Sequence, residues 1–166
     1  MYTIISATNR IGSHTEKVAR HYQKILKEKG IDAKLFSLKN LNVLEKNPAF
    51  IIAESDFLLP AQKIIFIMPE YNGSYPGVLK AMIDISDVKN AWYHKKALLV
   101  GVSTGRAGNL RGMDHITGSL HHIKMIVHHN KLPISVIDKI MDENGEINNK
   151  NTLQAIDQQI EEFIKF

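Results

Sequence analysis

The sequence predicts an α/β protein in which a five-stranded parallel sheet carries helices on both faces, as a three-layer sandwich. Three observations predict this class. Short apolar segments alternate with longer amphipathic ones along most of the chain, which is the order of parallel strands joined by crossover helices. Residues 63–67 and 97–102 are apolar at nearly every position, as central parallel strands are. Polar, glycine-containing loops follow the first, third and fourth strands.

Each element follows from its own pattern. Strands are expected at residues 2–7, 31–37, 63–67 and 97–102, and helices at residues 14–29, 49–59, 76–84, 110–124 and 152–165. Gly30 is the expected C-cap of the first helix. Residues 125–127 and 132–136 both qualify as a fifth strand, and the sequence does not choose between them. Residues 142–146 form a turn. With right-handed crossovers, five such strands favour the flavodoxin-like order, whose ligand site lies beyond strands one and three.

Composition limits both architecture and function. The chain has 166 residues, 44% of them hydrophobic, which predicts one domain over residues 1–166. The absence of cysteine excludes thiolate catalysis, thiolate metal ligands and disulfides. The net charge of +4 is scattered, so no nucleic-acid partner is expected. No leader precedes the first strand and no apolar run approaches ~20 residues, so we expect a cytoplasmic protein without a membrane partner.

The loop after the first strand suits an anion. Its hydroxyl and cationic side chains are Thr8, Arg10, Ser13 and Thr15. They precede a helix N-terminus, where unpaired N–H groups and the helix dipole favour a phosphate. A structural alternative is a capping box, in which Ser13 caps the helix and Glu16 reaches back to it. The spaced glycines and lysine of a P-loop are missing.

The loop after the third strand suits a planar ligand. It offers a phenol, short polar side chains and free backbone N–H groups, with Pro69, Glu70, Tyr71, Asn72 and Ser74 as candidates. The alternative is a tight turn at residues 72–73, with Ser74 capping the next helix and Pro76 near its first position. That alternative leaves Glu70 and Tyr71 unexplained.

The loop after the fourth strand carries Ser103 and Gly105, and its glycines permit close backbone approach to a ligand. Gly101, Ser103 and Gly105 also fit G-x-S-x-G, the nucleophile elbow of serine hydrolases. A serine esterase using Ser103 is therefore an alternative. Against it, the chain is short for a hydrolase sheet, and no histidine follows His129.

Two pairs of histidines and one tryptophan are candidates for other roles. The pairs His121-His122 and His128-His129 invite a metal interpretation, but helical neighbours point about 100° apart and no third ligand is obvious. We therefore expect no metal site. Trp92 is placed beside the ligand site, at a subunit contact or over the end of the sheet, and the sequence does not choose.

The three loops together resemble those of the NADPH-dependent FMN reductase family, which is flavodoxin-like and includes chromate, quinone and azo-dye reductases. The specific part is Pro69-Glu70-Tyr71-Asn72 with Ser74, Pro76, Gly77 and Lys80. Thr8 and Thr15 depart from the family's first loop, and Asn109 stands where its third loop usually has a second glycine. The resemblance covers residues 2–136.

The resemblance implies a bound FMN and NADPH or NADH as co-substrate. Arg10, Ser13, Thr15 and Thr8 would hold the phosphate. Pro69, Glu70, Tyr71, Asn72 and Ser74 would line the ring, and Ser103 and Gly105 would approach it from the third loop. A ping-pong reduction of quinones, azo dyes, metal oxyanions or free flavin would follow, with no catalytic side chain. It also implies a homodimer or homotetramer. A flavin-binding electron carrier or redox sensor without substantial NAD(P)H turnover remains the main alternative.

Overall fold

The computed structural model describes all 166 residues and contains a single parallel sheet. Its strands are β1 (Tyr2–Ser6), β2 (Ala33–Ser37), β3 (Lys63–Pro69), β4 (Lys96–Val102), β5 (Ile126–Val127) and β6 (Leu132–Ile134). The spatial order β2-β1-β3-β4-β5 is the flavodoxin-like order that the sequence predicts. Ser6 lies beside Ile67, and Pro69 lies beside Val102. The carboxyl ends of the three central strands therefore meet at one edge of the sheet.

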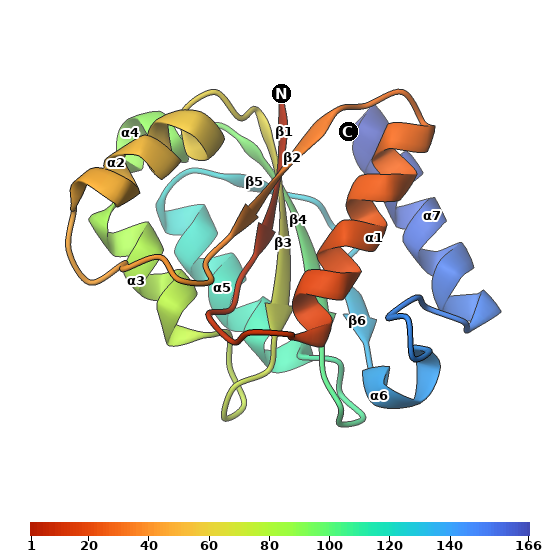
Figure 1. The fold of residues 1–166 in the computed structure, drawn as a ribbon. Helices are drawn as coiled ribbons and strands as arrows, with labels where there is room; N and C mark the ends of the chain where they lie inside the picture. The colour runs from red at the N-terminus through yellow and green to blue at the C-terminus, as the bar shows by residue number, and fades with distance from the viewer.

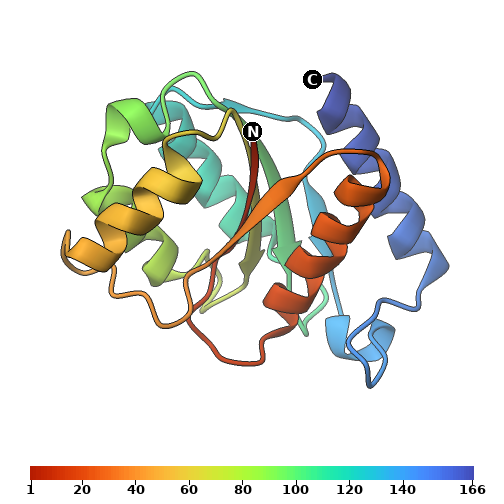
Figure 2. The same ribbon diagram turned by 45° about the horizontal axis from the view of Figure 1, so that its top comes forward.

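Helices cover both faces, which confirms the predicted three layers (Figure 1). They are α1 (His14–Glu28), α2 (Pro48–Ala53), the π-helix η1 (Glu54–Leu58), α3 (Gly77–Ile85), α4 (Val88–Ala91), α5 (Leu110–His122), α6 (Ile137–Ile140) and α7 (Lys150–Lys165). Helices α1 and α7 pack side by side on one face, and α2 to α5 lie on the other (Figure 2). Successive strand residues alternate between the two cores: Ile4 and Ile65 face α1, while Ile5 and Phe66 face the opposite layer.

The fifth strand position is filled twice. β5 pairs with the start of β4, at Lys96 and Ala97, whereas β6 pairs with its end, from Val100 to Val102. Both candidate segments are thus strands. Between them, the buried side chain of Gln159 donates to the Leu99 carbonyl (3.2 Å) and to the Asn130 carbonyl (2.8 Å). This amide satisfies the carbonyl that a continuous strand would otherwise bind.

The helix expected at residues 49–59 begins at Pro48, capped by Asn47, whose Oδ1 accepts from the Phe50 N–H (3.0 Å). It then widens into η1, in which the Leu59 N–H donates to the Glu54 carbonyl (2.9 Å). Buried Glu54 pairs there with Lys46 (2.9 Å). The short helices α4 and α6 were not predicted, because four residues show no periodicity.

Smaller differences concern element ends. The C-cap of α1 is Lys29 and not the predicted Gly30. Gly30 is the next residue and has φ +78°. The turn at residues 142–146 is confirmed by the Asp142 carboxylate, which accepts from the Glu146 N–H (2.8 Å). None of the helices is both long and apolar enough to cross a lipid bilayer.

Candidate functional site

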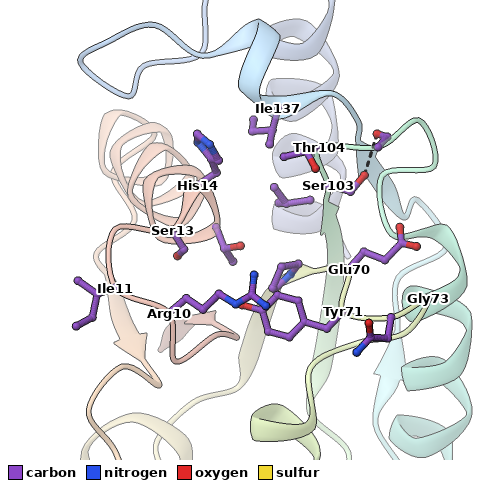
Figure 3. Close-up of a pocket in the computed structure, with 15 residues that line it drawn as sticks. Arg10, Ile11, Ser13, His14, Glu70, Tyr71, Gly73, Ser103, Thr104 and Ile137 are labelled. Atoms are coloured by element: carbon purple, nitrogen blue, oxygen red, sulfur yellow. Dashed lines mark hydrogen bonds between the residues drawn. The ribbon is translucent and has the colours of Figure 1, made fainter.

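The loops after β1, β3 and β4 enclose a cavity of about 520 Å³ at the carboxyl edge of the sheet (Figure 3). Its lining residues are Arg10, Ile11, Ser13, His14, Thr15, Pro69, Glu70, Tyr71, Asn72, Gly73, Val102, Ser103, Thr104, Gly105 and Ile137. The three loops that the sequence singles out therefore converge on one site. Its volume lies within the range of small-molecule and cofactor pockets.

The first loop opens a helix N-terminus toward the cavity. Gly12 takes φ +68°, which turns the chain into α1. The Ser13 hydroxyl then accepts from the Glu16 N–H (3.2 Å), as an N-cap does. The backbone N–H groups of Ser13, His14 and Thr15 donate to no protein acceptor. Together with the Arg10 guanidinium, these three donors form a place suited to an anion.

Only half of the predicted capping box exists. The Glu16 carboxylate does not return to Ser13 but pairs with Arg20 one turn later (2.7 Å). An i,i+4 partner on the helix surface competes successfully for it. The Glu16 carboxylate, which would repel a phosphate, is therefore paired with the Arg20 guanidinium.

A threonine joins the first loop to the second. Thr8 is buried, and its hydroxyl lies 2.5 Å from the Tyr71 hydroxyl while accepting from the Arg10 N–H (3.1 Å). The Arg10 guanidinium lies 4.1 Å from the centroid of the Tyr71 ring, within cation–π range (Figure 3). Thr8 does not line the cavity. Its contacts instead fix the position of the phenol.

The second loop is a two-residue turn. Asn72 and Gly73 both have positive φ, 52° and 77°, and Tyr71 and Ser74 exchange backbone hydrogen bonds of 2.9 and 3.1 Å. The tight turn is therefore present, but Ser74 does not cap the next helix. The N-cap of α3 is Pro76.

Ser74 faces α5 instead of the cavity. Its hydroxyl lies 2.9 Å from His115 Nδ1, which anchors the turn to that helix. Two predicted ligand residues, Thr8 and Ser74, thus do not line the cavity. The other nine line the cavity.

The third loop is closed by Ser103. Its hydroxyl donates to the Gly105 carbonyl (2.9 Å, dashed in Figure 3) and accepts from the Gly108 N–H (3.0 Å). No imidazole is hydrogen-bonded to it, so the esterase alternative lacks a general base for its nucleophile. The N–H groups of Thr104 and Gly105 donate to no protein acceptor. They are the free donors on this side of the cavity.

Sequence analysis missed the role of Asn109. This residue is fully buried, and its Nδ2 donates to the carbonyls of Met68 (3.1 Å) and Pro69 (2.9 Å) at the end of β3. Its φ of +63° is the left-handed conformation that glycine also adopts, which explains why asparagine fits here. Asn109 therefore links the start of α5 to the strand that carries the second loop.

Several further lining residues were not predicted. Ile11, His14 and Thr104 belong to loops that the sequence already singles out, so proximity to the motifs was their signal. The His14 Nδ1 lies 3.3 Å from the Met141 sulfur. Ile137 comes from α6, and no local pattern marks it.

Trp92 has no part in this site. It is fully buried, its ring lies 6.2 Å from that of Phe66, and its Nε1–H donates to the Ser86 hydroxyl (2.6 Å). Of the three placements considered, it covers the amino end of the sheet as part of the core. Complete burial excludes both the ligand site and a subunit contact.

The fold and the cavity together define a flavodoxin-like protein, and solved structures agree. FerB, a flavoenzyme NAD(P)H:(acceptor) oxidoreductase from Paracoccus denitrificans, superimposes with a TM-score of 0.85 at 19% identity, covering 99% of this chain and 94% of that one. An apo NADH:FMN oxidoreductase gives 0.79 at 19% identity, covering 98% and 87%. An archaeal flavodoxin gives 0.64 at 14% identity, covering 99% and 98%.

The chain belongs to the NADPH-dependent FMN reductase family, whose model matches residues 2–137. An NAD(P)H-dependent FMN reductase of Pseudomonas aeruginosa is 31% identical over 106 residues, 61% of this chain and 56% of that protein. A quinone reductase of Pseudomonas putida is 27% identical over 118 residues, 66% and 62%. The matched segments thus span only about half to three-fifths of these curated relatives. The description of the family names FMN and NADPH.

The residues present fit FMN. Three free N–H groups at the start of α1, with Arg10 in the same cavity, match a phosphate monoester in charge and hydrogen-bonding capacity. In the second and third loops, Tyr71 and Pro69 supply flat apolar surface, and the free N–H groups of Thr104 and Gly105 match acceptors on the edge of a ring. The phosphate and the ring of FMN therefore both match groups that line the cavity.

Proposed function

We propose that this protein is an FMN-dependent oxidoreductase that takes hydride from NAD(P)H and reduces small acceptors by a ping-pong mechanism. The observation that carries the proposal is the cavity itself, which is lined by the free N–H groups at the start of α1, by Arg10 and by the Tyr71 ring over which the Arg10 guanidinium lies. The family match and the likeness to flavin oxidoreductases support it.

In this proposal the cavity residues divide the coenzyme between them. Arg10, Ser13 and Thr15 hold the phosphate through charge, hydroxyls and backbone N–H groups. Pro69, Glu70, Tyr71 and Asn72 line the ring, and Ser103 and Gly105 approach it from the third loop. Thr8 and Ser74 act from behind the wall, where they fix Tyr71 and the 72–73 turn.

When bound, FMN supplies the redox chemistry, accepting electrons from the nicotinamide and passing them to the acceptor. The protein orients the reactants and sets the local field. The free N–H groups of Thr104 and Gly105 stabilise negative charge that develops on the ring edge; such a donor is typically worth ~2.7–4 kcal/mol in other enzymes. No side-chain acid, base or nucleophile is assigned.

Quinones are the acceptor class that the relatives favour. Curated relatives include a 2-hydroxy-1,4-benzoquinone reductase from a Burkholderia species as well as the quinone reductase of Pseudomonas putida. A planar quinone would enter the cavity after the nicotinamide has left it, as a ping-pong order requires. We also propose a homodimer or homotetramer, which light scattering of the purified protein tests.

The test is an absorbance spectrum followed by turnover. Purified protein with added FMN should show a flavin spectrum shifted from that of free FMN. Anaerobic NADPH should bleach it, and benzoquinone should restore it. Initial rates at several fixed quinone concentrations should give parallel double-reciprocal lines. Protein that leaves the FMN spectrum unchanged would overturn the proposal.

A flavin-binding electron carrier is the second candidate, because archaeal and other flavodoxins share the fold at TM-scores of 0.64 and 0.62. Steady-state NADPH oxidation with ferricyanide or a quinone distinguishes the two. A flavin that dithionite reduces, but that NADPH does not turn over, would favour the carrier.

A further inference from the structure

A cluster of ionisable side chains lies far from the cavity. His128 and His129 follow β5, and Glu162 lies on α7. The His128 N–H donates to the Ala97 carbonyl near the start of β4, whereas the cavity lies beyond Val102 at its end. At ~3.3 Å per residue along a strand, the two places are on the order of 15–20 Å apart. The proposed reductase chemistry does not use this cluster.

His128 is a buried imidazole without a strong partner. It is 2% exposed, and its ring packs edge-on against Phe163 and Phe166 at centroid distances of 5.9 and 4.9 Å. Its single hydrogen bond is long, 3.3 Å from the Asn130 N–H to Nδ1. Aromatic packing fixes the ring in place but uses little of its capacity to bind through nitrogen.

Glu162 is oriented by two amides. Its Oε2 accepts from Asn130 Nδ2 (2.7 Å) and its Oε1 from Gln158 Nε2 (2.9 Å). Each carboxylate oxygen can still accept a further partner. Such hydrogen bonds to a carboxylate resemble the outer shell that orients metal ligands in proteins.

We propose that His128, His129 and Glu162 form a binding site for a divalent transition-metal ion such as Zn²⁺. One ligand atom from each residue lies within 4.8 Å of the other two. Two imidazoles and one carboxylate are a donor set that Zn²⁺ accepts, with a fourth position left for water. Ligand atoms in a tetrahedral zinc site lie ~3.4 Å apart, from bond lengths of ~2.0–2.1 Å. The ligand atoms must therefore move closer together when the ion binds. Rotation of the exposed His129 side chain supplies much of this movement.

The ammonium of Lys63 moderates the expected affinity. It donates to the carbonyls of Phe163 (2.9 Å) and Ile164 (3.0 Å), and it lies 5.4 Å from the centroid of the Phe163 ring, against which His128 also packs. A second cation nearby weakens metal binding, so we expect a dissociation constant in the micromolar range rather than a tighter one.

The chain offers its own control. His121 and His122 are also consecutive and exposed, but they lie within α5, where neighbouring side chains diverge by about 100°. No carboxylate gathers with them in the way that Glu162 gathers with the other pair. Zn²⁺ binding should therefore require His128 and His129 but not His121 and His122.

An occupied site would join the segment between β5 and β6 to α7. These parts are more than thirty residues apart in sequence, so the ion adds a long-range link to the folded state. A ligand that binds only the native protein stabilises it by mass action. At a hundredfold excess of Zn²⁺ over the dissociation constant, the melting temperature should rise by roughly 5 °C.

The test is calorimetric titration of tag-free protein with Zn²⁺, together with the visible spectrum of added Co²⁺ and thermal unfolding. We expect one site per chain, tetrahedral Co²⁺ bands and a raised melting temperature. His129→Ala and Glu162→Gln should each weaken binding at least tenfold and remove the thermal shift. Both substitutions are on partly or fully exposed side chains, so the variants should remain folded.

His122→Ala should bind Zn²⁺ like the parent protein. The proposal is overturned if the parent shows no saturable binding below 1 mM, or if His122→Ala loses as much affinity as His129→Ala. It is equally overturned if Glu162→Gln binds unchanged. Because none of these measurements involves flavin, they stand apart from the tests of the proposed function.

Discussion

Arg10 is the one guanidinium among the residues that line the cavity. It lies over the Tyr71 ring, and its backbone N–H donates to Thr8. Residues from two loops therefore position a cation in the wall of the cavity that the first residues of α1 also line. This arrangement supplies the positive charge of the anion-binding part of the cavity, and the backbone N–H groups supply its directed hydrogen bonds.

Replacement of Arg10 tests the phosphate assignment. Arg10→Ala should raise the dissociation constant of FMN roughly 10- to 100-fold, since a hydrogen bond to a charged group contributes about 1.5–3 kcal/mol. Riboflavin, which lacks the phosphate, should be affected far less. Arg106→Ala is the matched control, because Arg106 is exposed and outside the cavity. Equal losses for FMN and riboflavin would place Arg10 beside the ring instead.

Asn109 lends itself to a separate prediction. Asn109→Ala leaves the Met68 and Pro69 carbonyls without their amide donor and places alanine at positive φ. We expect a loss of about 1–3 kcal/mol in the free energy of unfolding, measured with urea. Asn151→Ala, on the exposed surface of α7, should change it by less than about 0.5 kcal/mol. A neutral Asn109→Ala would show that the two carbonyls do not need this amide.

At this scale the sequence predicted which loops meet but not where each hydroxyl points. Thr8 and Ser74 turn away from the cavity because each finds a nearer partner, Tyr71 in one case and His115 in the other. Those partners are 63 and 41 residues away in sequence, so no local sequence pattern indicates them.

Among the elements, α1 and α7 are joined through one buried polar group. Tyr22 donates its hydroxyl to Gln159 Oε1 (2.7 Å), and the amide of Gln159 binds Leu99 and Asn130. The same side chain therefore links two helices to the gap between β5 and β6. Every polar atom of that amide has a partner, which allows its complete burial.

Burial raises the pKa of Tyr22 well above its ordinary value near 10. The folded state therefore keeps the phenol protonated where the unfolded chain would lose the proton, and stability falls as pH rises above about 10. Tyr22→Phe should lose roughly 1 kcal/mol at pH 7, because it leaves Gln159 Oε1 unpaired. This deficit should shrink above pH 10, as followed by urea unfolding. Parallel pH profiles for parent and variant would contradict the assignment.

Element prediction succeeded where periodicity was strong and local. The central strands, α1 and α7 follow from apolar spacing, and their ends fall within a few residues of expectation. The divided fifth strand could not be predicted, since it depends on Gln159, which is 29 residues from Asn130 in sequence. The widening of the second helix into η1 likewise depends on where Glu54 meets Lys46 and Asp87.

In the whole molecule, the packed cores and the cavity lie in different places. Two apolar cores enclose the strands from both sides, and the loops that project from their carboxyl ends carry the cavity. A cofactor held mainly by backbone donors needs this rigid support, because loop geometry then follows from strand register. The fold was predictable from the alternation of elements, and the fold in turn predicted that the three loops meet at one edge of the sheet, where the cavity lies.

Ligand binding should stabilise the molecule as a unit. At a hundredfold excess over its dissociation constant, FMN should add about 2.7 kcal/mol and raise the melting temperature by roughly 5 °C. At the same concentration, riboflavin should raise it less, because it leaves the donors at α1 unused. Calorimetric melting measures both. Equal shifts would mean that the phosphate contributes nothing to binding.

The most direct measurement is a crystal structure of the protein grown with FMN. We predict density for the phosphate within hydrogen-bonding distance of the Ser13, His14 and Thr15 N–H groups, with the three-ring system beside Tyr71 and the third loop. Density for FMN at any other place, or a cavity closed by side chains in crystals saturated with the coenzyme, would contradict it.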